Sequence, residues 1–186
     1  MSFLANNIYH VYNRSINQEK LFNEEKDYLR FLEMTRKHLS SSCEMLGWCL
    51  MPNHFHFLIY TNDKSIEIKK VGGLHLQMIQ NGIKNLLSSY SKSYNFQHQR
   101  KGNLFQQKTK YKKVLTDSLQ VLHYIHQNPW KSGLVTKIED WIFSSFNDFA
   151  GFRNVFRQAR PWSDFCWASR DGRALHHLTL RHKKLR

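Results

Sequence analysis

The chain has 186 residues, of which 41% are hydrophobic and 14% aromatic, so its composition allows a folded core and excludes an intrinsically disordered protein. Its 28 Lys and Arg outnumber 14 Asp and Glu, and the net charge of +14 favours a polyanionic partner, most often nucleic acid, over the competing anionic membrane surface. The chain has neither an apolar run of about 18 residues nor the features of a signal peptide, so we expect no membrane segment.

The first half of the chain alternates strand patterns with helical periodicity. Residues 8–12 are β-branched and aromatic, which predicts a strand. Asn23 is the expected N-cap of a helix whose apolar positions recur up to Leu39. Residues 43–51 and 54–60 then read as two strands, and the tight connection between them predicts antiparallel neighbours.

The second half begins with a helical pattern from about residue 65 to Tyr90. Gly72-Gly73 interrupts this pattern and indicates a break or hinge between a short helix and a longer one. Residues 94–110 are polar and Gln-rich, which predicts a loop presented to a partner. A strand is expected near residues 111–115, followed by a helix that is capped by residue 116 or 117 and stops at Asn128-Pro129.

The resulting order, β-α-β-β-α-β-α, predicts an α+β fold. It is the split βαβ, ferredoxin-like plan, with an antiparallel sheet covered by helices on one face and one added C-terminal helix. We expect residues 1–151 to form this domain. Residues 152–186 are expected to form a basic C-terminal extension, either a hairpin or a poorly ordered tail.

The three cysteines are widely spaced along the chain. Cys43, Cys49 and Cys166 form neither a C-x-x-C metal pattern nor a disulfide framework. Such a set suits a reducing compartment, and we therefore expect a cytoplasmic protein.

Two histidines flank one phenylalanine in the predicted strand at residues 54–60. Because successive strand side chains alternate faces, His54 and His56 are expected to project from one side and Phe55 into a core on the other. This spacing places two metal ligands before an ion arrives. Two ordinary histidines on a solvent-exposed strand face are the alternative, since a bare His-x-His pattern is common.

The last predicted helix carries a tyrosine and an amide on one face. Tyr124 and Asn128 are one helical turn apart, and Gln127 lies near the same face. Beside a metal that polarises a phosphodiester, the ionised tyrosine could attack phosphorus and leave a covalent phosphotyrosine and a free hydroxyl. The alternative interpretation of Tyr124 is a partly buried packing residue.

Basic residues interleaved with aromatic rings mark the expected nucleic-acid contacts. Arg14 follows the first strand and is expected to contact either phosphate or solvent. The same two alternatives hold for Lys84 on the long helix. From residue 100 to residue 113 the chain has cations, aromatic rings and no acids, a pattern that suits unpaired bases. The candidate nucleic-acid-binding residues are Arg14, Lys84, Arg100, Lys101, Phe105, Lys108, Lys110, Lys112 and Lys113.

Several motifs recur together in the order and spacing of a known family, from about residue 7 to residue 151. The most specific combination is Met-Pro-Asn-His-x-His with a distant Tyr-x-x-x-Asn-Pro. The matching segments are residues 9–14, 49–56, 102–106, 124–129 and 131–135, with Trp141, Ser144 and Ser145. On these residues the chain resembles the single-tyrosine HUH transposases, and within them the REP-associated tyrosine transposases and their relatives.

The resemblance implies that His54 and His56 are metal ligands and Tyr124 is the nucleophile. Asn128 would be the third ligand, with Gln127 as the alternative. The family uses Mg²⁺ or Mn²⁺, which the free protein would hold weakly, and no nucleotide cofactor. Its substrate is single-stranded DNA beside a hairpin, which is nicked and rejoined through a 5′-phosphotyrosine.

Three questions stay open at this point. Members of the family occur as monomers and as homodimers that exchange helices. A catalytically inactive nucleic-acid-binding relative would keep the fold and lose the chemistry. A metal-dependent nuclease that uses water would keep the histidines and dispense with Tyr124.

Overall fold

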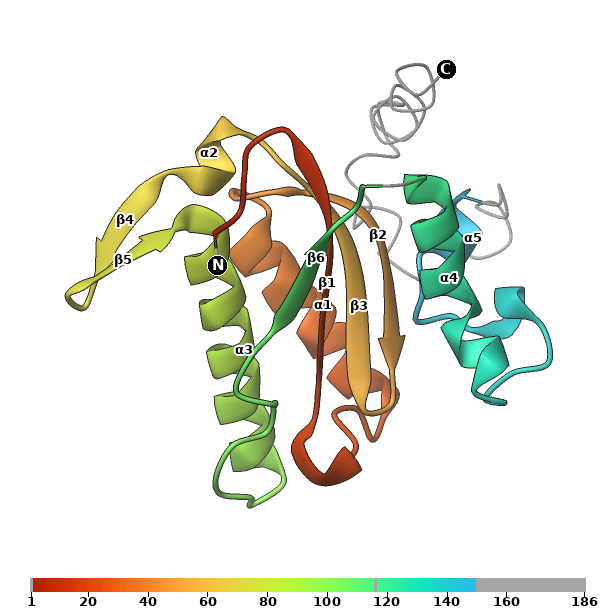
Figure 1. Ribbon diagram of the computed structural model, residues 1–186. Helices are drawn as coiled ribbons and strands as arrows, with labels where there is room; N and C mark the ends of the chain where they lie inside the picture. The colour runs from red at the N-terminus through yellow and green to blue at the C-terminus, as the bar shows by residue number, and fades with distance from the viewer. Residues whose placement is uncertain (1, 116, 150–186) are drawn as a thin grey trace.

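The structure is a computed structural model that describes residues 2–115 and 117–149. Within these residues the chain forms strands, α-helices and two short 3₁₀ segments (Figure 1). In chain order they are β1 (Asn7–Arg14), η1 (Ile16–Gln18), α1 (Glu25–Leu39), β2 (Glu44–Met51), β3 (His54–Thr61), α2 (Asp63–Ile66), β4 (Ile68–Val71), β5 (Leu74–Gln77), α3 (Met78–Gln97), β6 (Lys110–Lys113), α4 (Ser118–Lys131), η2 (Ile138–Asp140) and α5 (Phe146–Phe149).

The main sheet has four strands in the order β2-β3-β1-β6, and every neighbouring pair is antiparallel. This order, with α1 after β1 and α3 before β6, is the split βαβ plan. Helices α1 and α3 cover one face of the sheet, and α4 lies against the other face beside β2 (Figure 1). The predicted α+β fold with an added C-terminal helix is therefore confirmed.

The larger core fills the space between the sheet and helices α1 and α3. Phe55, Phe57 and Ile59 of β3 point into it, as the period of two predicted. The ring of Phe31 on α1 meets the ring of Tyr90 on α3 edge-to-face, with centroids 4.9 Å apart. The alternate residues of β3, including both histidines, consequently face the side of the sheet that carries α4.

Helix α4 is fixed on the sheet by close packing and by a buried serine. An added Cβ at Gly47 of β2 would collide with Leu122 Cδ1 of α4, so the helix approaches through space that only glycine leaves. Ser145 Oγ accepts a hydrogen bond from the Trp48 N–H at 2.9 Å and lies 2.9 Å from His126 Nε2 of α4. These contacts hold the helix that carries Tyr124.

The structure corrects the predicted helix break at Gly72-Gly73. Strands β4 and β5 form an antiparallel hairpin, and both glycines have positive φ, 56° and 82°. Two central residues with positive φ are what a tight two-residue hairpin turn requires, which explains the paired glycines. Figure 1 shows this hairpin projecting from the body of the protein beside α2.

Other boundaries differ by a few residues. The N-cap of α1 is Glu24 and not Asn23. The Asp27 side chain accepts hydrogen bonds from the N–H groups of both Asn23 and Glu24. Helix α3 continues to Gln97, so the predicted loop is shorter. Asp117 caps α4 as expected, since its side chain accepts from the Leu119 N–H.

The predicted fourth strand lies slightly earlier, at Lys110–Lys113. The proposed C-terminal extension and Cys166 lie outside the described residues. Among the described residues, no helix has the length and apolar character needed to cross a bilayer.

Candidate active site

Strand register brings polar side chains of three strands to one face of the sheet. Tyr12 of β1 pairs with His56 of β3 on one side and Lys110 of β6 on the other. Arg14 pairs with His54 two residues further along. Because paired residues on neighbouring strands project from the same face, His54 lies beside the Arg14 side chain and His56 beside the ring of Tyr12.

Each candidate metal-ligating histidine has one ring nitrogen held by a neighbour. His54 Nδ1 lies 2.6 Å from Asn53 Oδ1, which can only accept, so Nδ1 carries the proton and Nε2 keeps its lone pair. His56 Nδ1 lies 2.9 Å from His10 Nε2, and in the tautomer in which His56 Nδ1–H donates to His10 Nε2, Nε2 of His56 keeps its lone pair and is the ligand atom. Metal-binding histidines are normally oriented by such partners.

Burial favours the neutral form of these imidazoles. Desolvation, reinforced by His10 and His54, lowers the pKa of His56 to about 3. Desolvation and Lys112 lower the pKa of His10 to about 4, and burial with Arg14 also lowers the pKa of His54. All three rings are therefore neutral at pH 7, as metal ligation requires.

Tyr124 on α4 meets this histidine cluster from the facing helix. Its ring centroid lies 6.2 Å from those of His10 and His56, and both contacts are edge-to-face. The side chain is 45% exposed, so a ligand can reach it. Lys131, on the same helix, places its Nζ 5.8 Å from the centroid of the tyrosine ring and adds positive charge there.

Asn128 has a structural role that also orients its amide. Its Nδ2 donates to the carbonyl oxygens of Tyr124, at 2.9 Å, and Ile125, at 3.3 Å. Pro129 lacks the N–H that would reach Ile125 in a regular helix, and the Asn128 amide substitutes for it. The helix therefore continues to Lys131 and does not stop at Asn128-Pro129 as predicted. Because Nδ2 is engaged with the helix, Oδ1 is the atom left for a ligand.

One cavity of about 440 Å³ connects these groups. His54, His56, Tyr124 and Asn128 all line it, whereas Gln127 does not and contacts His123 instead. The cations that line it are Arg14, Lys108 and Lys110, and no Asp or Glu does so. The cavity therefore suits an anionic ligand such as a phosphodiester.

Two neutral imidazoles and an amide oxygen are acceptable ligands for Mg²⁺ or Mn²⁺, although they bring no negative charge. Within the described residues, no three His, Cys, Asp or Glu side chains are grouped to hold a metal ion. A third protein ligand at the histidine pair can be an amide oxygen, and Asn128 is one of the amide side chains that line the cavity, together with Asn13, Gln18, Asn53 and Gln106.

The predicted nucleic-acid contacts divide into several groups. Lys112 pairs with His10 on the face of the sheet that carries the cavity, and Lys113 pairs with Tyr9, whose ring lies in the core on the other face. Lys101 is exposed in the loop after α3, and Lys84 lines a separate groove on α3.

Two of the predicted contacts are corrected by the structure. Phe105 is 7% exposed and packs in the core near Phe31 and Tyr90, so it is not an exposed ring placed among the cations as expected. The Arg100 guanidinium is paired with Glu19, its Nη2 lying 2.7 Å from Oε2, and this ion pair ties the loop to η1.

Three further residues contact the site without a role predicted from sequence: His10, Asn53 and Lys131. His10 lies two residues before Tyr12 in a strand, so its face could have been inferred from alternation. Its partner could not, because the contact with His56 depends on the register of β1 against β3.

Comparison with models of protein families found no match, and neither did comparison with curated proteins. Among solved structures, the chain is similar to a REP-associated tyrosine transposase bound to a REP hairpin, with 17% sequence identity and a TM-score of 0.61. The match covers 87% of this chain and 86% of that chain. A crystal structure described as a transposase from Deinococcus radiodurans R1 covers 68% of this chain and 94% of its own, with 16% identity and a TM-score of 0.45. At 17% identity, the first likeness shows a shared fold.

Proposed function

We propose that this protein is a single-tyrosine DNA transposase that nicks and rejoins single-stranded DNA through Tyr124. The observation that carries the proposal is the convergence of His54, His56, Tyr124 and Asn128 on one basic cavity. The ferredoxin-like fold, shared with a REP-associated tyrosine transposase, supports it. Fold alone does not define function, so the proposal depends on the side chains in the cavity.

In this proposal, Mg²⁺ or Mn²⁺ would be held by His54, His56 and Asn128, through Nε2 of each imidazole and Oδ1 of the amide. The bound ion would polarise the scissile phosphodiester as a Lewis acid. Because the three ligands are neutral, the DNA phosphate must contribute to binding, and the free protein is expected to bind the ion weakly. Arg14, Lys108 and Lys110 bind the phosphate through charge-assisted hydrogen bonds.

Tyr124 supplies the nucleophile. Its phenolic oxygen loses its proton to solvent and bonds to phosphorus while the bond from phosphorus to the 3′ oxygen breaks, and that oxygen takes up a proton from solvent. The products are a 5′-phosphotyrosine and a free 3′ hydroxyl. The covalent link keeps the phosphodiester energy, so attack by another 3′ hydroxyl rejoins the DNA without a nucleotide cofactor.

The substrate proposed is an unpaired strand next to a DNA hairpin. The similar solved transposase is bound to a REP hairpin, which supports this substrate for the present chain. The ring centroids of Tyr124 and His56 of one chain lie 6.2 Å apart, and His54 lines the same cavity, so the site needs no helix from a second copy. We therefore propose that a monomer is sufficient for cleavage.

A labelled single-stranded oligonucleotide carrying a hairpin, incubated with Mn²⁺, tests the proposal. We expect a covalent protein–DNA adduct in denaturing gels that is lost in Tyr124→Phe and in His54→Ala. Tyr60→Phe is the matched control, because Tyr60 lies on the same face of β3 and does not line the cavity.

Three other results would each contradict the proposal. An adduct that persists in Tyr124→Phe would exclude this nucleophile. Cleavage without any adduct would indicate a nuclease that uses water. Binding without cleavage at any Mn²⁺ concentration would indicate an inactive DNA-binding relative.

A further inference from the structure

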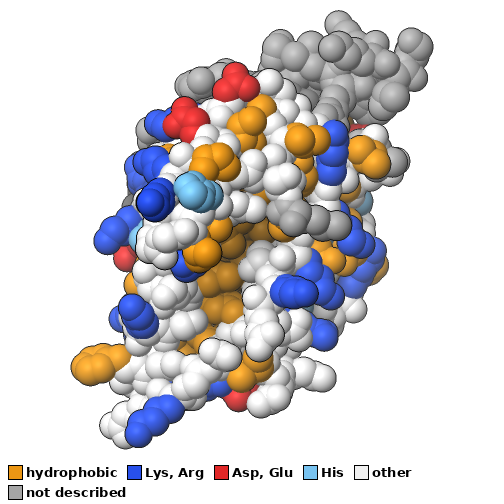
Figure 2. All heavy atoms as spheres, turned by 60° about the vertical axis from the view of Figure 1, so that its left-hand side comes forward, with side chains coloured by type: hydrophobic (Ala, Val, Ile, Leu, Met, Phe, Trp, Pro, Cys, Tyr) orange, Lys and Arg blue, Asp and Glu red, His pale blue; other side chains and the backbone are white. Residues whose placement is uncertain are grey.

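A second hollow of about 620 Å³ lies between α3 and residues 102–111. Figure 2 shows it as a depression with an apolar floor and basic side chains near its margins. It opens on the side of the sheet that α3 covers, and Gln106 is the one residue that lines both this groove and the cavity around Tyr124. We call it the α3 groove.

The floor of the α3 groove is apolar and partly aromatic. Ile83 and Leu87 of α3 and Leu104 of the facing segment contribute to it. The ring of Tyr111 stacks on that of Phe3, with centroids 4.3 Å apart, and both residues line the groove. An open apolar surface with a stacked ring suits the flat face of an unpaired base.

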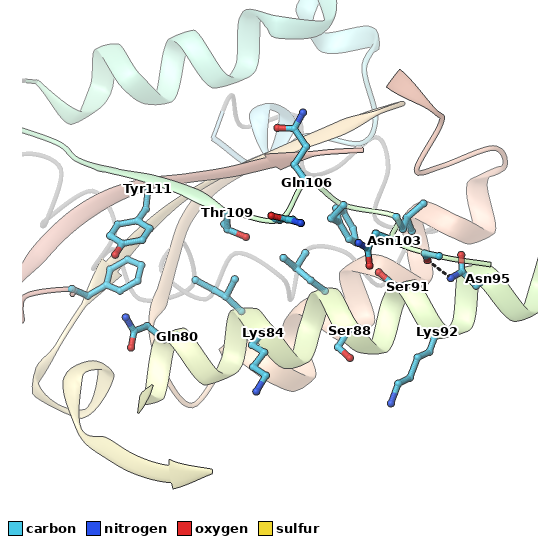
Figure 3. Close-up of a pocket in the computed structure, with 17 residues that line it drawn as sticks. Gln80, Lys84, Ser88, Ser91, Lys92, Asn95, Asn103, Gln106, Thr109 and Tyr111 are labelled. Carbon is cyan, nitrogen blue, oxygen red and sulfur yellow. Dashed lines mark hydrogen bonds between the residues drawn. The ribbon is translucent and has the colours of Figure 1, made fainter. Parts of the chain in front are cut away.

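The outer rim of the groove is basic. Lys84, Ser88 and Lys92 follow one another at single-turn intervals along α3, and Figure 3 shows the ammonium ends extending away from the floor. Neither lysine forms an ion pair within the part of the chain that the structure describes. None of the residues that line the groove is Asp or Glu. The two cations are about 12 Å apart along the helix axis, so an anionic chain that contacts both must run along α3.

The opposite wall carries polar groups. Asn103, Gln106 and Thr109 lie across the groove from the α3 lysines in Figure 3. Asn and Gln amides donate and accept hydrogen bonds to the edges of unpaired bases. Cations on the rim, amides on the wall and an apolar floor together match a strand whose phosphates stay outside and whose bases turn inward.

The segment before and within β6 separates the two sites. Its side chains alternate, so Lys108 and Lys110 line the Tyr124 cavity while Gln107, Thr109 and Tyr111 line the α3 groove. Because β6 is an edge strand of the sheet, no further strand blocks the way from one side to the other in the described residues.

We infer that the α3 groove binds unpaired nucleotides of the same DNA strand that reaches Tyr124. Lys84 and Lys92 contact phosphates, and a base lies on the floor formed by Leu87 and Tyr111. That this strand is the one cleaved at Tyr124 rests on the proposed function. Binding of single-stranded DNA in the groove does not itself require cleavage.

Fluorescence anisotropy with a labelled single-stranded oligonucleotide in EDTA tests the inference without any chemistry. The test variant is Lys84→Gln/Lys92→Gln. The matched control is Lys37→Gln/Lys137→Gln, which removes the same charge from exposed positions outside both sites.

We expect about tenfold weaker binding for the groove variant at moderate salt. The slope of log K against log salt should become shallower by about 1.4, since each phosphate contact on a single strand contributes about 0.7. The control should keep the wild-type slope. An affinity and slope equal to those of the control would overturn the inference.

Photocrosslinking gives a second readout that does not depend on the variants. DNA with 5-iodouracil at successive positions should crosslink wild-type protein at Tyr111 from one region of the strand. No crosslink to residues of the groove from any position would overturn the inference. If wild-type protein forms no covalent adduct, yet the groove variant binds DNA more weakly and Tyr111 crosslinks, the proposed function is wrong and the inference about the groove holds. If the adduct forms but neither binding result is obtained, only the inference about the groove is wrong.

Discussion

Replacing His10 with Ala should weaken metal-dependent cleavage, although His10 is not among the proposed metal ligands. The substitution removes the 2.9 Å contact between His10 Nε2 and His56 Nδ1. His56 is 6% exposed, so water replaces the lost partner poorly. Loss of a side chain that orients a metal-binding histidine typically costs about 10- to 100-fold in metal affinity.

The assay is the Mn²⁺ concentration that gives half-maximal adduct formation on single-stranded DNA. We expect it to rise by about 10- to 100-fold in His10→Ala and to recover partly in His10→Gln, whose side-chain oxygen can accept from His56 Nδ1. His75→Ala, an exposed position on β5, is the control.

Two results would refute this reasoning about His10. The first is an unchanged Mn²⁺ requirement in a variant whose thermal unfolding shows an intact fold. The second is an equal loss of DNA affinity in EDTA, which would mean that His10 contacts DNA and does not orient a metal ligand.

Three further predictions concern the packing that supports the site. Gly47→Ala should lower the free energy of unfolding by about 1–3 kcal/mol in urea titrations, because the new methyl group collides with Leu122 and displaces α4; unchanged stability would mean that α4 adjusts freely. Ser145→Ala should cost about 1–3 kcal/mol in the same assay, because the buried Trp48 N–H loses its acceptor; Ser145→Thr should retain part of it. Burial raises the pKa of the Cys43 thiol to about 12, so in a variant with the other two cysteines changed to serine it should resist Ellman's reagent at pH 8 until urea unfolds the protein; fast labelling of folded protein would contradict this burial.

Local pattern in the sequence was enough for several features of the site. Alternation along residues 54–60 placed both histidines on one face, and the structure puts Phe55 and Phe57 in the core on the other. The order of strand and helix patterns was sufficient for the split βαβ plan. Tyr124 and Asn128 share a helix face because they are four residues apart, and this spacing is a property of the helix itself.

Other features depended on contacts between distant parts of the chain. The sequence around Phe105 is basic and polar, yet its ring is buried because α3 and the sheet meet over it. Arg100 pairs with Glu19, 81 residues away, and so is not free for phosphate. The pairing of His10 with His56 required the register of two strands separated by a helix and a third strand.

The physical reason is that periodicity encodes which side chains share a face, whereas contact between faces is set by tertiary packing. Residues 68–77 illustrate the limit, because their short apolar pattern is compatible with a helix or a hairpin and the two glycines permit either a break or a turn. The sequence by itself determined the two histidines, the tyrosine, the amide and the excess of positive charge. Only the tertiary structure decided that these groups line one cavity and that a second groove lies behind the same edge strand.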